Sequence, residues 1–147
     1  MHMLRKTHRA GIRPVQRRAS RLGAAATEFA IIAPVFLLLV IGIIELGRAL
    51  MVQQVLVNAS RVGVREAITL GATSTGVQAA VEDYSASVAV PGVSVTVSPD
   101  PATAIAGDAI LVTASVPFED VSWMASPWFL GGRTLTASSR MRKEGFE

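Results

Sequence analysis

The sequence predicts an α+β protein in which one long N-terminal helix packs against a small antiparallel β-sheet. Three observations support this fold class. An apolar run without charges covers residues 29–44, apolar and small residues then recur every three or four positions as far as Leu70, and alternation with a period of two begins after Pro91-Gly92. Gaps of three and four are typical of an amphipathic helix, whereas alternation indicates half-buried strands. The helix is therefore expected to have a membrane-spanning half and an amphipathic outer half.

The first 23 residues are strongly basic. They carry seven Arg and Lys residues and no acid, whereas the remaining 124 carry seven bases and eleven acids, a net charge of −4. We expect residues 1–23 to form a disordered cytoplasmic leader, because they include Pro14 and show no apolar periodicity. The leader directly precedes the apolar run, so the positive-inside rule explains its charge better than nucleic-acid binding does. No Phe, Tyr or Trp lies in it to stack on a base. A membrane is thus an expected partner and a nucleic acid is not.

A single membrane span is expected at residues 24–44. Phe29–Ile44 gives about 24 Å of helix, which is short of a hydrocarbon core of about 30 Å, whereas a start at Ala24 lengthens it to about 32 Å. Glu28 then lies in the first turns, near the cytoplasmic interface. A carboxylate is costly there and usually has a purpose. Pro34 is expected to be a tolerated kink inside the span.

Residues 45–70 are expected to extend the same helix outside the membrane. A polar row at Gln54, Asn58, Arg61 and Arg65 lies on one face. Arg61 and Arg65 either contact a partner protein or form a solvated face that pairs with acids, and the sequence favours neither. Gly71 is the expected C-cap. The apolar stripe consists of Leu46, Ala49, Leu50, Val55, Leu56, Ala59, Val62, Gly63, Ala67 and Leu70.

Residues 71–147 are expected to form an extracytoplasmic β-rich domain. The pattern predicts a loop at 71–76, a short helix at 77–90, strands at 93–97 and 110–116, and a weaker strand at 135–141. Two or three strands are not stable alone. We therefore expect them to pack on the outer half of the long helix. Trp123, Trp128 and Phe129 are expected to be buried under the sheet rather than to contact the membrane interface or a partner.

The sequence offers no support for catalysis, a cofactor or a metal site. There is no cysteine, which excludes disulfides and thiolate metal ligands. Both histidines, His2 and His8, lie in the leader, and the acidic pair Glu82-Asp83 is too slight to indicate a metal site. We therefore expect a protein that is not an enzyme. The twin Arg17-Arg18 raise the alternative of a Tat signal, which the very hydrophobic span and the lack of an Ala-x-Ala site directly after it make weak.

The start of the span resembles a known processing motif. Gly23-Ala24, followed by Glu28-Phe29, is similar to the cleavage motif of type IV pilins and pseudopilins, which a prepilin peptidase recognises. Three further segments resemble the TadE-like minor pseudopilins of tight-adherence (type IVb, Flp-type) pilus systems: Glu45–Ala49, Ala59–Ala67 and Leu135–Glu144. With the turn and strand at 107–118, the resemblance covers nearly the whole chain. The order and spacing of these segments around one membrane span make the resemblance specific.

The resemblance implies a pilin-like fold and a structural function in assembly of a tight-adherence pilus. The peptidase would cut between Gly23 and Ala24, and Glu28, next to Phe29, would pair with the N-terminal ammonium of a neighbouring subunit. Two charges that are each costly in lipid offset one another when paired there. The alternative for Glu28 is a carboxylate that merely reaches the interface of a signal anchor.

The resemblance also implies partners and a location. The partners are the prepilin peptidase, other pilin and pseudopilin subunits, and the inner-membrane assembly platform. The location is the bacterial inner membrane, crossed once, with the N-terminus in the cytoplasm and the C-terminus outside. The rival hypothesis is a permanently signal-anchored envelope protein that binds an extracytoplasmic ligand. A mature N-terminus at Ala24 supports the first hypothesis and one at Met1 the second.

Overall fold

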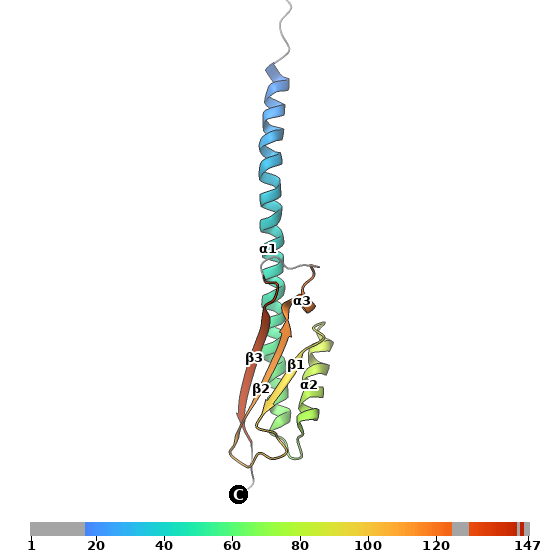
Figure 1. The fold of residues 1–147 in the computed structure, drawn as a ribbon, viewed down its shortest axis with the longest axis vertical. Coiled ribbons are helices and arrows are strands. Elements are labelled where there is room, and N and C mark those ends of the chain that lie inside the picture. Colours follow the sequence, from blue (N-terminus) through green and yellow to red (C-terminus); the bar gives the residue numbers. More distant parts are fainter. Residues whose placement is uncertain (1–16, 125–129, 144, 146–147) are drawn as a thin grey trace, which may run out of the picture. The chain divides into compact units, whose positions relative to one another are not determined.

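The structure is a computed structural model that describes residues 17–124, 130–143 and 145. It confirms the α+β class (Figure 1). The chain divides into two compact units, residues up to Val40 and residues from Ile41 onward, and helix α1 runs through both. In chain order the elements are α1 Arg17–Ala67, α2 Ser74–Ser87, β1 Ser94–Ser98, β2 Ala109–Pro117, α3 Phe118–Val121 and β3 Thr134–Arg142.

Helix α1 begins earlier than expected. The expected span begins at Ala24 after a disordered leader, but the helix starts at Arg17, so residues 17–23 of that leader are helical. The physical reason is that Arg, Ala and Leu, which dominate this stretch, are good helix formers. Residues 1–16 of the leader lie outside the described residues. The helix continues through Pro34.

The end of α1 also differs from the prediction. The helix ends at Ala67, four residues before the expected C-cap Gly71. Both the N–H and the hydroxyl of Thr69 donate to the carbonyl of Glu66, at 3.2 and 2.8 Å, and this turn closes the helix. Gly71 lies in the loop that follows, with φ +77°, a conformation that glycine adopts without steric cost.

The three strands form one antiparallel sheet in the order β1-β2-β3 (Figure 1). All three predicted strands are present, and each of their bounds differs by one residue from the expected one. The predicted alternation of β2 is confirmed, because Ile110, Val112, Ala114 and Val116 are fully buried. The register places Ile110 opposite Met141 at the first part of β2.

The second half of α1 packs against this sheet, as predicted. Val52, Leu56 and Ala59 of α1 belong to the same buried cluster as Val112 of β2. Gly63 allows a close approach, because a Cβ there would lie 2.5 Å from Val81 Cγ2 of α2 and 3.0 Å from Val112 Cγ1. The core of this unit therefore lies between α1, α2 and the sheet.

The expected apolar stripe of α1 is wrong at three positions. Leu46, Leu50 and Leu70 are exposed, whereas Val52 and Val64 are fully buried. Leu46 and Leu50 each follow a buried residue by one position, which turns them about 100° away from the core. Leu70 lies beyond the end of the helix.

Helix α2 is displaced toward the N-terminus from its expected range of 77–90. Thr73 is its N-cap, and its hydroxyl accepts a hydrogen bond from the Gly76 N–H at 3.1 Å. Such a cap satisfies a backbone donor that would otherwise be unpaired, so the helix starts at Ser74. The short helix α3 was not predicted.

Candidate functional site

The predicted processing and assembly residues all lie on α1 within the first unit. Gly23, Ala24, Glu28 and Phe29 are exposed, and the Gly23–Ala24 bond lies inside the helix, which begins six residues earlier at Arg17. The Thr27 hydroxyl donates to the Gly23 carbonyl at 2.9 Å. A Cβ built on Gly23 would meet no atom within 4 Å. The helix thus presents these four positions to other molecules.

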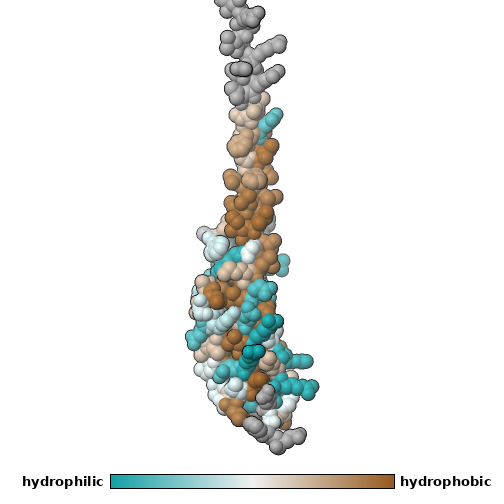
Figure 2. Space-filling view, turned by 180° about the vertical axis from the view of Figure 1, so that it is seen from behind, coloured by the Kyte–Doolittle hydropathy of each residue, from teal (hydrophilic) through white to brown (hydrophobic). Residues whose placement is uncertain are grey.

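The apolar run on α1 is exposed as well. Phe29, Ile32, Phe36 and Leu39 are each more than half exposed, and hydrophobic residues gather over this part of the helix on the face drawn in Figure 2. An exposed apolar surface of this extent is unfavourable in water and favourable in lipid. The segment from Gly23 is long and apolar enough to cross a membrane, which is consistent with a single-pass membrane protein.

A buried polar cluster of Glu45 and Arg48 follows the apolar run. The sequence did not predict it as a site. Arg48 is only 8% exposed. Its Nε donates to the Val121 carbonyl at 2.8 Å, and its terminal nitrogen donates to the Ala89 carbonyl at 3.2 Å. Ala89 follows α2 in a left-handed conformation with φ 59°, which is costly for a residue with a Cβ. Arg48 therefore connects α1 to the segments that end α2 and α3.

Glu45 lies three positions before Arg48 and is 4% exposed. Neither of its carboxylate oxygens has a hydrogen-bond partner among the described residues. Positions three apart are neighbours on a helix surface, so the charge of Arg48 offsets part of the cost of burying this carboxylate. The signal was present in the sequence as two opposite charges, three positions apart, directly after an uncharged run.

The prediction that Trp123 is buried under the sheet is wrong. This residue is 72% exposed, and the guanidinium carbon of Arg48 lies 5.2 Å from the centroid of its ring. The reason is that α3 is a single turn that ends at Val121, so Trp123 follows it out of the core and stacks on a cation instead. Trp128 and Phe129 lie outside the described residues.

Within residues 17–124, 130–143 and 145, no group of three or more His, Asp and Glu side chains is placed to hold a metal ion. The absence of a catalytic role was an expectation from the sequence. It stays a prediction.

In the part of the chain that the structure describes, the fold comprises one candidate membrane span and one small α+β unit. Residues 23–65 match the family described as TadE-like protein. The match covers Gly23, Glu28 and the cluster of Glu45 and Arg48, and over these residues it confirms the resemblance to the TadE-like proteins of tight-adherence pili. The resembling segments at 107–118 and Leu135–Glu144 lie outside the match. No curated protein and no solved structure matches the chain.

Proposed function

We propose that this chain is a structural minor pseudopilin that is processed by a prepilin peptidase and acts in the assembly of a tight-adherence pilus. The observation that carries the proposal is the match to TadE-like proteins over residues 23–65, on a helix where Gly23, Ala24 and Glu28 are all exposed. Those are the positions that processing and assembly require to be accessible.

The proposed cleavage requires the helix to open locally. A peptide bond inside an α-helix must be unwound before a peptidase can attack it, and glycine costs about 1 kcal/mol relative to alanine in a helix interior. Gly23 is therefore a weak point in α1, and the six helical residues before it add little resistance. An exposed glycine next to Ala24 suits a narrow membrane-embedded active site.

Cleavage would leave an ammonium group on Ala24 at the start of the mature helix. A positive charge at a helix N-terminus is unfavourable, because the macrodipole is positive there. The Glu28 carboxylate of a neighbouring subunit would offset it, most strongly where lipid lowers the dielectric constant. Processing and assembly are linked in this way, and the remaining partners would be other pilin subunits and the assembly platform of the bacterial inner membrane.

The experiment that tests the proposal is the N-terminal sequence of the membrane-extracted protein, expressed with and without the cognate prepilin peptidase. We expect Ala24 when the peptidase is present and Met1 when it is absent. Met1 in both preparations would instead support a permanently anchored envelope protein with an extracytoplasmic ligand.

A further inference from the structure

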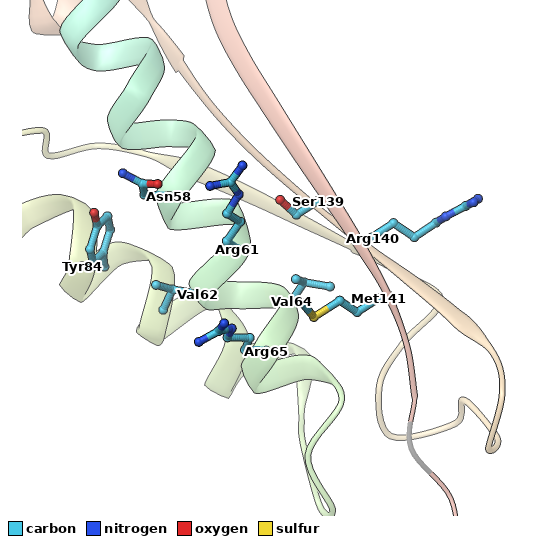
Figure 3. A pocket seen from close by; sticks show the side chains of 9 residues that line it. All are labelled: Asn58, Arg61, Val62, Val64, Arg65, Tyr84, Ser139, Arg140 and Met141. Atoms are coloured by element: carbon cyan, nitrogen blue, oxygen red, sulfur yellow. The ribbon is translucent and has the colours of Figure 1, made fainter.

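Three arginines line one hollow on the second unit. The hollow has a volume of about 450 Å³ and lies between α1, α2 and β3 (Figure 3). Arg61 and Arg65 come from successive turns of α1 and Arg140 from β3, and all three are exposed. We call this hollow, with Asn58, Tyr84 and Met141 on its walls, the basic groove.

Within the described residues, no ion pair or side-chain hydrogen bond engages the three arginines of the basic groove. Among the hydrogen bonds between described residues, Arg48 and Lys143 donate to backbone carbonyls, whereas Arg61, Arg65 and Arg140 donate to none. Figure 3 shows the Arg140 side chain pointing away from the other two arginines, so the strongest repulsion is between Arg61 and Arg65, four positions apart on α1, and an anionic occupant relieves it. The groove is a local feature, because residues 41–147 carry seven basic and ten acidic residues, a net charge of −3.

A complementary surface lies at the other end of the sheet. Glu119 and Asp120 are adjacent, exposed residues of α3, and Trp123, which is 72% exposed, follows them. We call these three residues the acidic corner. Strand β2 connects the two surfaces, since Ile110 pairs with Met141 of the groove and Pro117 leads directly into α3.

The separation of the two surfaces prevents a contact within one chain. The eight steps along the chain from Ile110 of β2 to Phe118, the first residue of α3, span about 27 Å. The side chains of Arg140 and Glu119 cannot bridge that length. A contact between the basic groove and the acidic corner therefore requires two molecules.

We propose that the acidic corner of one copy of this chain binds in the basic groove of a second copy. The two carboxylates would accept charge-assisted hydrogen bonds from the planar guanidinium groups of Arg61 and Arg65. The exposed indole of Trp123 would pack against Met141 on the β3 side of the groove. The contact is heterologous, so each bound copy keeps one unused surface and further copies can add head to tail.

Other anions fit the groove less well. Asn58 lies 14 residues after Ile44, or about 21 Å along α1 from the end of the apolar run, which is farther than the headgroup layer of a bilayer reaches. A nucleic acid would meet the net negative charge of the rest of the unit. The proposal does not depend on the function proposed above, because it requires neither cleavage at Gly23 nor a pilus.

The lack of cysteine in the chain allows a direct test by disulfide cross-linking. Full-length Asn58→Cys and full-length Ser122→Cys, carrying tags of different size, are mixed in detergent micelles and oxidised. We expect a mixed dimer on a non-reducing gel. A mixture of Asn58→Cys and Thr96→Cys is the matched control, because Thr96 is exposed on β1 and is not part of the acidic corner, and it should give at least tenfold less mixed dimer.

Charge reversal tests the head-to-tail geometry. Adding Arg61→Glu and Arg65→Glu to both cysteine variants, or adding Glu119→Arg and Asp120→Arg to both, should lower the yield at least tenfold. If the groove is reversed only in the Ser122→Cys copy and the corner only in the Asn58→Cys copy, the yield should return, because each copy supplies its intact surface. Arg133→Glu, an exposed arginine outside the groove, should leave the yield unchanged and controls for net charge.

Two results would overturn the proposal. The first is a mixed dimer whose yield is the same with either reversal alone, in both copies, as with the unreversed surfaces. The second is the absence of any mixed dimer between the Asn58→Cys and Ser122→Cys copies while both remain folded. Unchanged circular dichroism and melting temperature of each variant in detergent ensure that a lost cross-link reports the interface and not unfolding.

Discussion

The guanidinium group of Arg48 lies 5.2 Å from the centre of the Trp123 ring while its Nε donates to the Val121 carbonyl at 2.8 Å. One side chain of α1 thereby holds the segment after α3 through both a cation–π contact and a hydrogen bond. Its third contact, to the carbonyl of Ala89, adds the segment after α2. Arg48, four residues after the end of the apolar run, is thus a structural centre of the second unit.

Arg48→Ala should lower the free energy of unfolding of this unit by about 2–4 kcal/mol. Hydrogen bonds to a charged group are worth about 1.5–3 kcal/mol, and the substitution leaves two carbonyls without their donor. Thermal unfolding in detergent, followed by circular dichroism, measures the change. Arg133→Ala, at an exposed arginine, is the control and should change the free energy by less than about 0.5 kcal/mol. Equal stabilities of the two variants would contradict the role of Arg48.

Glu45→Gln should raise the free energy of unfolding, by about 1 kcal/mol. The carboxylate is buried without a hydrogen-bond partner among the described residues, and the neutral amide of similar shape is less costly to bury. Denaturation of the variant and the unmodified chain under the same detergent conditions checks the sign. A loss of stability would mean that the charge of Glu45 has a favourable partner, with Arg48 the nearest candidate.

Gly63→Ala should destabilise the second unit by about 1–3 kcal/mol. The new methyl group would lie 2.5 Å from Val81 Cγ2, so α1, α2 and β2 would have to separate. Gly47→Ala on the same helix is the matched control, because a Cβ there meets nothing within 4 Å. That variant should gain up to about 1 kcal/mol from helix propensity. If the two variants had the same melting temperature, the close packing at Gly63 would not determine the stability of the second unit.

Gly23→Val should block maturation and leave membrane insertion intact. Insertion depends on the apolar run and the flanking charge, whereas cleavage requires a small residue before the bond and a weak point in the helix. An immunoblot of the membrane fraction should show the precursor accumulating. Gly23→Ala should give a milder defect, and the structure has room for its methyl group. Mature mobility for Gly23→Val would remove the processing hypothesis.

Glu28→Ala and Glu28→Gln should both insert normally and fail to support piliation. The glutamine keeps the shape and the hydrogen bonding of the side chain but loses the charge, so its failure would identify Coulombic pairing with an N-terminus as the important term. Surface pili counted by electron microscopy, with membrane levels checked in parallel, give the readout. Wild-type piliation by both variants would leave Glu28 as an ordinary interfacial carboxylate.

Regular patterns in the sequence predicted the fold class and the strands well. Alternation at Ile110, Val112 and Val116 reports burial directly, because neighbouring residues of a strand point to opposite faces. On α1 the same reasoning misassigned Leu46 and Leu50, since gaps of three and four fit two adjacent helix faces and only packing selects between them. The burial of Arg48 depends on carbonyls 41 and 73 residues away, and no local pattern predicts it.

The residues that precede Gly23 in α1 have a consequence for the mature chain. In a helix that begins at Arg17, the N–H groups of residues 24–27 point to carbonyls on residues 20–23. A cut after Gly23 removes those acceptors and leaves four donors unsatisfied at the edge of the lipid, where water is scarce and unpaired backbone groups are costly. Proteolysis would therefore move the unpaired donors of the first turn from residues 17–20 to the edge of the lipid, where an acceptor from another molecule is needed.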